Sequence, residues 1–121
     1  MEKLIYVVDD DELMASCLGR ILKSKDYKVK IFKNIPEIML ALDEEPLPNL
    51  IFLDVLLPGF DGFSFLNEIA TYSDTSKIPI ILVSSLDFKE KDLKIYGVKG
   101  ILKKEEMTPK EILFYAERYS N

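Results

Sequence analysis

The chain contains no histidine, and this absence excludes several common kinds of site. Without an imidazole there is no usual general base, no typical zinc ligand and no histidine to carry a phosphoryl group itself. A single cysteine, Cys17, cannot form an internal disulfide, which fits a reducing compartment. Cys17 falls on the apolar side of a predicted helix, so we expect it to be buried by packing rather than used in chemistry.

Long hydrophobic runs are also missing. The longest apolar runs are four or five residues, too short to span a bilayer, and the Met-Glu-Lys start is not typical of a secretory signal. We therefore expect a cytoplasmic protein without membrane insertion. A net charge of −5 argues against nucleic acid as a direct partner. The length of 121 residues predicts one domain, residues 1–121, with a single core.

Apolar and amphipathic segments alternate regularly along the chain. Unbroken apolar runs predict strands covered on both faces, and apolar residues at helical spacing predict helices between them. Strands are predicted over Leu4–Val8, Lys28–Phe32, Leu50–Leu53, Ile78–Val83 and Gly100–Leu102. Helices are predicted over Glu12–Lys23, from a cap at Asn34 to Leu42, from a cap at Asp61 to Tyr72, from a cap at Asp87 to Tyr96, and from a capping box at Thr108 to Tyr119. The pattern is that of an α/β fold, (βα)₅, with a parallel sheet.

Polar and charged residues stand at the carboxyl ends of the predicted strands, where ligands bind in open α/β sheets. They are Asp9 and Asp10, Asp54, Ser84, and Lys103 or Lys104. Clustered carboxylates attract a cation such as Mg²⁺, and a carboxylate can act as a nucleophile to give an aspartyl phosphate. Taken singly, these residues read as helix-capping acids, turn residues and a surface lysine. Their combination favours phosphoryl chemistry assisted by a metal, a hydroxyl and a lysine.

This combination resembles the receiver domain of two-component response regulators over the whole chain. The resemblance is carried by Val7–Asp10 at the end of the first strand, Asp54 with Pro58 and Gly62 beyond it, Ser84 after the fourth strand, and a lysine after the fifth. It implies a flavodoxin-like three-layer sandwich with a five-stranded parallel sheet in the order 2-1-3-4-5.

The resemblance also implies a phosphoacceptor and a metal site. Asp54 would accept a phosphoryl group from a sensor histidine kinase, a phosphotransfer protein or a small phosphodonor. The implied cofactor is Mg²⁺, with Asp10, Asp54 and the backbone carbonyl of Leu56 as ligands and Asp9 acting partly through water.

Two further residues complete the implied site. Ser84 would hydrogen-bond one phosphoryl oxygen, and Lys104, which the register of the resemblance prefers to Lys103, would pair with another.

The expected function is a phosphorylation-controlled switch of a phosphorelay that signals to an unknown downstream protein. It would not be an enzyme beyond catalysing phosphorylation and dephosphorylation of its own aspartate.

Three departures from the family pattern affect the output rather than the chemistry. Ser84 replaces the commoner threonine, Glu105 stands where proline is usual, and Ile101 replaces an aromatic residue that moves inward on activation. The chain ends at Asn121, directly after the last predicted helix, so we expect a stand-alone switch. The alternative is a receiver-like interaction module that binds partners without phosphorylation, against which the complete set of acids, hydroxyl and lysine argues.

Overall fold

The computed structural model describes residues 2–44, 46–54 and 62–121. A five-stranded sheet in the order β2-β1-β3-β4-β5, parallel at every pairing, forms its centre. Its strands are β1 (Leu4–Val8), β2 (Lys28–Phe32), β3 (Leu50–Asp54), β4 (Ile80–Ser84) and β5 (Val98–Lys103). The helices are α1 (Glu12–Lys23), α2 (Ile35–Leu42), α3 (Gly62–Thr71), α4 (Glu90–Leu93) with the 3₁₀ turn η1 (Lys94–Tyr96), and α5 (Pro109–Tyr119).

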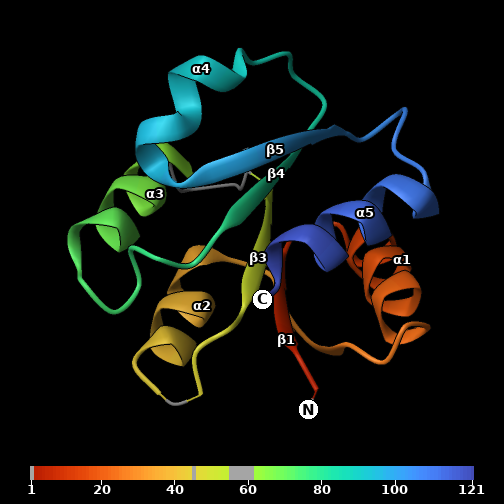
Figure 1. Cartoon of the computed structure of the whole chain (residues 1–121), viewed down its shortest axis with the longest axis horizontal. Coiled ribbons are helices and arrows are strands. Elements are labelled where there is room, and N and C mark those ends of the chain that lie inside the picture. Colours follow the sequence, from red (N-terminus) through yellow and green to blue (C-terminus); the bar gives the residue numbers. More distant parts are fainter. Residues whose placement is uncertain (1, 45, 55–61) are drawn as a thin grey trace.

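Helices cover both faces of the sheet, with α2, α3 and α4 on one side and α1 and α5 on the other (Figure 1). Successive strand residues point to opposite faces, so Tyr6 packs in the core under α2 and α3 while Val7 packs under α1 and α5. Burial on both faces explains the continuous apolar strand sequences. These observations confirm the flavodoxin-like three-layer sandwich and its predicted strand order.

Helix starts follow the capping signals in the sequence. The Asn34 side chain accepts a hydrogen bond from the Glu37 amide at 2.9 Å, as expected for the cap of α2. Thr108 and Glu111 form both bonds of the capping box that begins α5. After η1 the backbone of Gly97 adopts φ 79°, a left-handed conformation that suits glycine and ends the helical segment.

Several predicted boundaries were wrong by a few residues. Strand β4 begins at Ile80 rather than Ile78, and β5 is longer than expected because it starts at Val98, beside Ile80. The fourth helix is not capped by Asp87: the cap position is Lys89, and the Asp87 carboxylate instead accepts a hydrogen bond from Lys103 Nζ at 2.8 Å. The expected cap at Asp61 lies outside the described residues.

The expectation that Cys17 is buried was also wrong. The buried face of α1 consists of Ala15, Leu18, Gly19 and Leu22, and Cys17 is exposed one position away from it. A single step of about 100° around a helix is enough to carry a side chain from the core face to solvent. Within the described part of the chain, the helices fall short of the length and apolar character needed to cross a membrane.

Candidate functional site

Two buried carboxylates meet at the carboxyl edge of the sheet. Asp9 follows β1 and Asp54 ends β3, and these strands are neighbours with Val8 opposite Leu53. Their side chains are almost inaccessible, the residues being 2% and 3% exposed, whereas the adjacent Asp10 is exposed. Carboxylate oxygens of Asp9, Asp10 and Asp54 all lie within 4.8 Å of one another. The three predicted acids therefore form one cluster.

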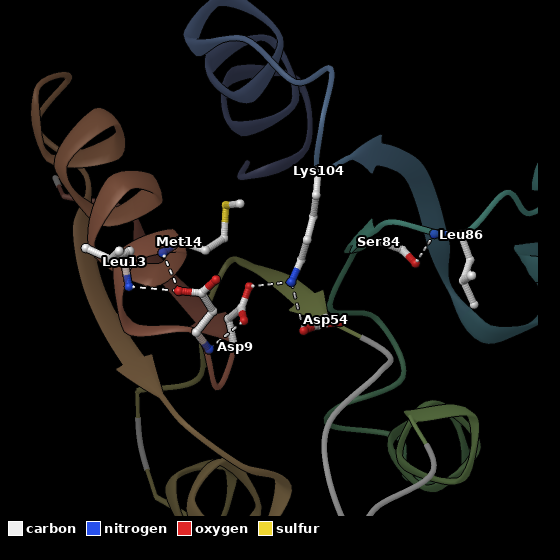
Figure 2. A network of polar contacts seen from close by, with 8 residues as sticks. Asp9, Leu13, Met14, Asp54, Ser84, Leu86 and Lys104 are labelled. Carbon is white, nitrogen blue, oxygen red and sulfur yellow. Dashed lines mark hydrogen bonds and ion pairs between the residues drawn. The ribbon is translucent and has the colours of Figure 1, made fainter.

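Lys104 supplies positive charge to this cluster from the end of β5. Its Nζ lies 3.1 Å from Asp54 Oδ2, to which it donates a hydrogen bond, and 3.3 Å from Asp9 Oδ2 (Figure 2). The backbone holds it there, because the Lys104 amide donates to the Ser84 carbonyl at 3.0 Å. Burial alone lowers the pKa of Lys104, but the hydrogen bond and charge of Asp54 and the charge of Asp9 outweigh burial and raise it.

Asp9 holds its charge less easily. Burial raises its pKa, the amide of Asp11 and the charge of Lys104 lower it, and the neighbouring charge of Asp54 raises it again, leaving it above its usual value. Asp9 Oδ1 accepts a hydrogen bond from the Asp11 amide at 2.9 Å. Asp9 Oδ2 is buried and makes an ion pair with Lys104, but no hydrogen bond with any described residue. This oxygen is therefore available to a cation other than the Lys104 ammonium, such as a metal ion.

The loop after β4 brings a hydroxyl to the same edge of the sheet. Ser84 is fully buried, and its Oγ accepts a hydrogen bond from the Leu86 amide at 3.0 Å. Figure 2 shows this hydroxyl directed toward Leu86. A hydroxyl can accept one hydrogen bond and donate another. Ser84 can therefore accept the Leu86 amide and still donate its proton to a group bound at the site.

Lys103 is placed differently from its neighbour. Its Nζ contacts the Asp87 carboxylate at 2.8 Å on the surface, in the loop between β4 and α4. The Asp87 contact raises the pKa of Lys103 through its hydrogen bond and its charge. Lys103 thus points away from the acids that Lys104 joins. The carbonyl of Leu56, the fourth expected metal ligand, lies outside the described residues.

Two contacts made by residues 85–96 were not predicted from the sequence. One is the Asp87–Lys103 pair, and the other is an aromatic group in which Phe63 lies 5.7 Å from Phe88 and 6.2 Å from Tyr96, ring centre to ring centre. The Asp87–Lys103 pair could have been predicted from the strand order. Parallel neighbours β4 and β5 place Ser84 opposite Lys103, so residues just after β4 lie beside the end of β5.

The cluster fits a hard divalent cation. Its donors among the described residues are carboxylate oxygens, which Mg²⁺ and Mn²⁺ prefer, and one of them, Asp9 Oδ2, is buried and has no hydrogen bond with these residues. Close negative charges repel, so a bound cation would lower the free energy of the cluster.

Comparison with known proteins decides the family. A model of the response regulator receiver domain matches residues 5–115. The chain belongs to the response regulator receiver domain family. It is 42% identical over 81 residues to the uncharacterized transcriptional regulatory protein YvcP of Bacillus subtilis (strain 168), covering 67% of this chain and 32% of that protein. The matched part of this chain thus spans about a third of this curated relative's length.

Solved structures agree with the fold. The chemotaxis protein CheY4 of Vibrio cholerae superposes with a TM-score of 0.87 at 22% identity, over 98% of this chain and 99% of that one. The Mn²⁺-bound form of response regulator Rcp1 superposes with a TM-score of 0.79 at 25% identity, over 98% and 95% of the two chains. Receiver domains belong to two-component signalling and are generally not enzymes.

Proposed function

We propose that this receiver domain is a phosphorylation-controlled switch whose phosphoacceptor is Asp54. The observation that carries the proposal is the meeting of three carboxylates with Lys104 at the carboxyl edge of a receiver fold. Of the three acids, Asp10 is exposed and one oxygen of Asp9 accepts the Asp11 amide, whereas Asp54 ends the central strand and accepts the hydrogen bond of Lys104. One of its carboxylate oxygens would attack phosphorus, and the bond to the donor would break.

The other residues of the cluster prepare Asp54 for this attack. Lys104 holds one oxygen of Asp54 in place and offers a positive charge to the incoming phosphoryl group. The proton of the Ser84 hydroxyl can be donated to another phosphoryl oxygen. Because Ser84 lacks the methyl group of threonine, its rotamer is less restricted and it can turn from Leu86 toward Asp54.

The implied cofactor is Mg²⁺, which Asp10, Asp54 and the Leu56 carbonyl would hold, with Asp9 acting partly through water. When bound it would neutralise negative charge on the transferred phosphoryl group. The exposed position of Asp10 leaves room for the waters that Mg²⁺ usually keeps. The Mn²⁺-bound form of Rcp1, which has the same fold, supports this proposal.

The segment from Ser84 to Tyr96 is the proposed moving element. Ser84 connects the site to this segment through its bond to Leu86, and Phe88 and Tyr96 connect the segment to α3 through Phe63. Drawing the Ser84 hydroxyl toward a phosphoryl group would release the Leu86 amide and favour a second arrangement of the loop. Ile101, half-buried on β5, has no ring to move in its place.

The partners proposed for the two sides of the switch are a sensor histidine kinase or phosphotransfer protein upstream and a protein target downstream. These 121 residues contain no histidine, so a donor histidine would lie outside them or be replaced by a small phosphodonor.

The proposal is tested by incubating the protein with acetyl phosphate and following its intact mass with and without EDTA. We expect one acid-labile phosphoryl group in Mg²⁺ and none in EDTA or in Asp54→Asn. A stable phosphoryl adduct on Asp54→Asn would remove Asp54 from this role. An unmodified wild-type protein in Mg²⁺, with partner binding intact, would favour the phosphorylation-independent interaction module instead.

A further inference from the structure

The distribution of charge along the chain is strongly uneven. Between Lys33 and Lys77 there is no lysine or arginine, so all 16 basic residues lie outside this segment, while eight of the 21 acidic residues lie within it. The segment contains α2, β3 and α3. Five of these acids are exposed in the described structure, on α2 and α3 or within three residues after them: Glu37, Asp43, Glu44, Glu68 and Asp74.

Between these two helices the surface is hollowed. One cavity of about 190 Å³ is lined by Met39, Leu42, Glu68, Ile69, Tyr72 and their neighbours Asp43, Asp74 and Thr75. A second of about 240 Å³ is lined by Ile35, Met39, Ser64, Phe65 and Glu68. They share Met39 and Glu68 and so form one groove along the two helices. We call it the α2–α3 groove; its floor is apolar and its rim is acidic.

An exposed aromatic side chain distinguishes the groove from an ordinary charged surface. Tyr72, directly after α3, lines the first cavity and is 54% exposed. Leu40 of α2 is 72% exposed but is not part of either cavity lining. Apart from Glu37, every residue of α2 is apolar, a composition typical of a helix that is covered all round. A single exposed apolar residue is normal, but Tyr72 is part of a groove whose floor is apolar.

We propose that the α2–α3 groove binds a basic amphipathic helix of a partner protein. Apolar side chains spaced at i, i+3 or i+4 and i+7 would enter the two cavities, as in other helix-in-groove complexes. Lysines or arginines flanking them would meet Asp43, Glu68 and Asp74 on the rim. Helix α3, of 10 residues, is about 15 Å long, enough to contact roughly three turns of a partner helix.

Other occupants fit these observations less well. A second copy of this chain bound through the same surface would bring two acidic rims together. An anionic membrane surface would be repelled in the same way. The groove is divided into two adjoining cavities of about 190 and 240 Å³, each below the roughly 300–1,000 Å³ of small-molecule pockets, and such a pair suits successive side chains of one helix.

The proposal is tested on the unphosphorylated full chain in saturating Mg²⁺, which keeps a cationic peptide out of the acidic cluster. A synthetic helical peptide of about 15 residues, with leucine at i, i+3, i+4 and i+7 and lysine elsewhere, is titrated against the protein by amide NMR. We expect shifts confined to residues 35–44 and 62–76. A peptide with glutamate in place of lysine should give none.

Two matched pairs of variants separate the groove from general charge attraction. Glu68→Lys should weaken peptide binding by about fivefold or more, whereas Glu117→Lys, the same charge change on α5, should alter it by less than about twofold. Met39→Gln should weaken it, and Leu13→Gln, at an exposed leucine of α1, should not.

Three results would overturn the proposal: no binding at millimolar peptide, equal losses in Glu68→Lys and Glu117→Lys, or shifts centred on Asp9 and Asp54. Concentration-dependent broadening of residues 35–44 and 62–76 without peptide would assign the groove to a second copy instead. None of these results depends on phosphorylation, so a failed phosphorylation test leaves this one unaffected.

Discussion

Lys103 and Lys104 are adjacent in the chain and identical in chemistry, yet they lie in different electrostatic environments. The Lys104 side chain is 18% exposed and contacts two carboxylates that are nearly buried. The Lys103 side chain is 37% exposed and contacts Asp87, whose side chain is 86% exposed. Both contacts are short, between 2.8 and 3.3 Å, so distance alone does not rank them.

The difference comes from what surrounds each pair. At a surface pair, water and salt screen the attraction, and holding two mobile side chains costs entropy. At the acidic cluster, Asp9 and Asp54 are buried and repel each other with little screening by water. The positive charge of Lys104 therefore offsets a larger unfavourable energy than the charge of Lys103 does. A difference of one position at the end of β5 therefore places Lys104 against the buried acids and Lys103 against a surface acid.

The largest expected effect is that of removing Lys104. In EDTA, Lys104→Ala should lower the free energy of unfolding by about 1–3 kcal/mol, less than for a fully buried pair because the site opens to solvent. With Mg²⁺ and beryllofluoride, which stands in for the phosphoryl group, its amide shifts across Ser84–Tyr96 should be lost. Lys103→Ala is the matched control and should respond as the wild type does. The reverse pattern would assign the site lysine to Lys103.

The next effect concerns the cation. Mg²⁺ at tenfold excess over its dissociation constant should stabilise the wild type by about 1.4 kcal/mol, measured by urea unfolding with and without EDTA. Asp54→Asn should lose most of this gain because it removes an expected ligand and a negative charge. A full Mg²⁺ response in Asp54→Asn would place the metal elsewhere.

A somewhat smaller effect is expected from the raised pKa of Asp9. A carboxyl group whose pKa is higher folded than unfolded favours the folded state below its ordinary value of 3.8 and loses that contribution as pH rises through its folded value. Asn does not titrate, so Asp9→Asn should not lose stability as the pH rises, and its side-chain oxygen can still accept the Asp11 amide. In EDTA it should match the wild type near pH 3.8 and be more stable near neutrality, by on the order of 1 kcal/mol after allowing for solvent screening.

The measurement is urea unfolding of both proteins at several pH values between acid and neutral. Ser16→Ala, at an exposed serine of α1, serves as a control without a titrating group. Equal stabilities of Asp9→Asn and wild type at neutral pH would mean that Lys104 fully compensates the buried charge.

Much of this arrangement was predictable from the sequence because its signals are local. Apolar runs identify the buried strands, and Asn34 and Thr108 identify helix starts through bonds to residues three positions on. Asp9 and Asp54 could be placed together because both follow strands that pair in a parallel sheet. The family resemblance added the strand order, which periodicity alone does not contain.

The errors arose where a long-range contact competes with a local one. Asp87 has the sequence of a helix cap, but its carboxylate pairs with Lys103, 16 residues away, and α4 begins later. Cys17 was predicted to be buried because cysteine is an apolar residue type. The buried residues of α1 form a face that does not include position 17. The pairing of Phe63 with Phe88 and Tyr96 likewise depends on how α3 and α4 sit on the sheet.

The smallest expected effect is that of breaking the Asp87–Lys103 pair. Asp87→Ala and Lys103→Ala should each leave the urea midpoint within the scatter of repeat measurements, because solvent and salt already screen this pair. The double variant should equal either single one. A clear, salt-sensitive loss in both single variants that does not add in the double variant would show instead that the pair fixes the loop after β4. In that case the beryllofluoride response of Ser84–Tyr96 should become larger or faster in Asp87→Ala, since the same contact would oppose the movement of the loop toward Asp54.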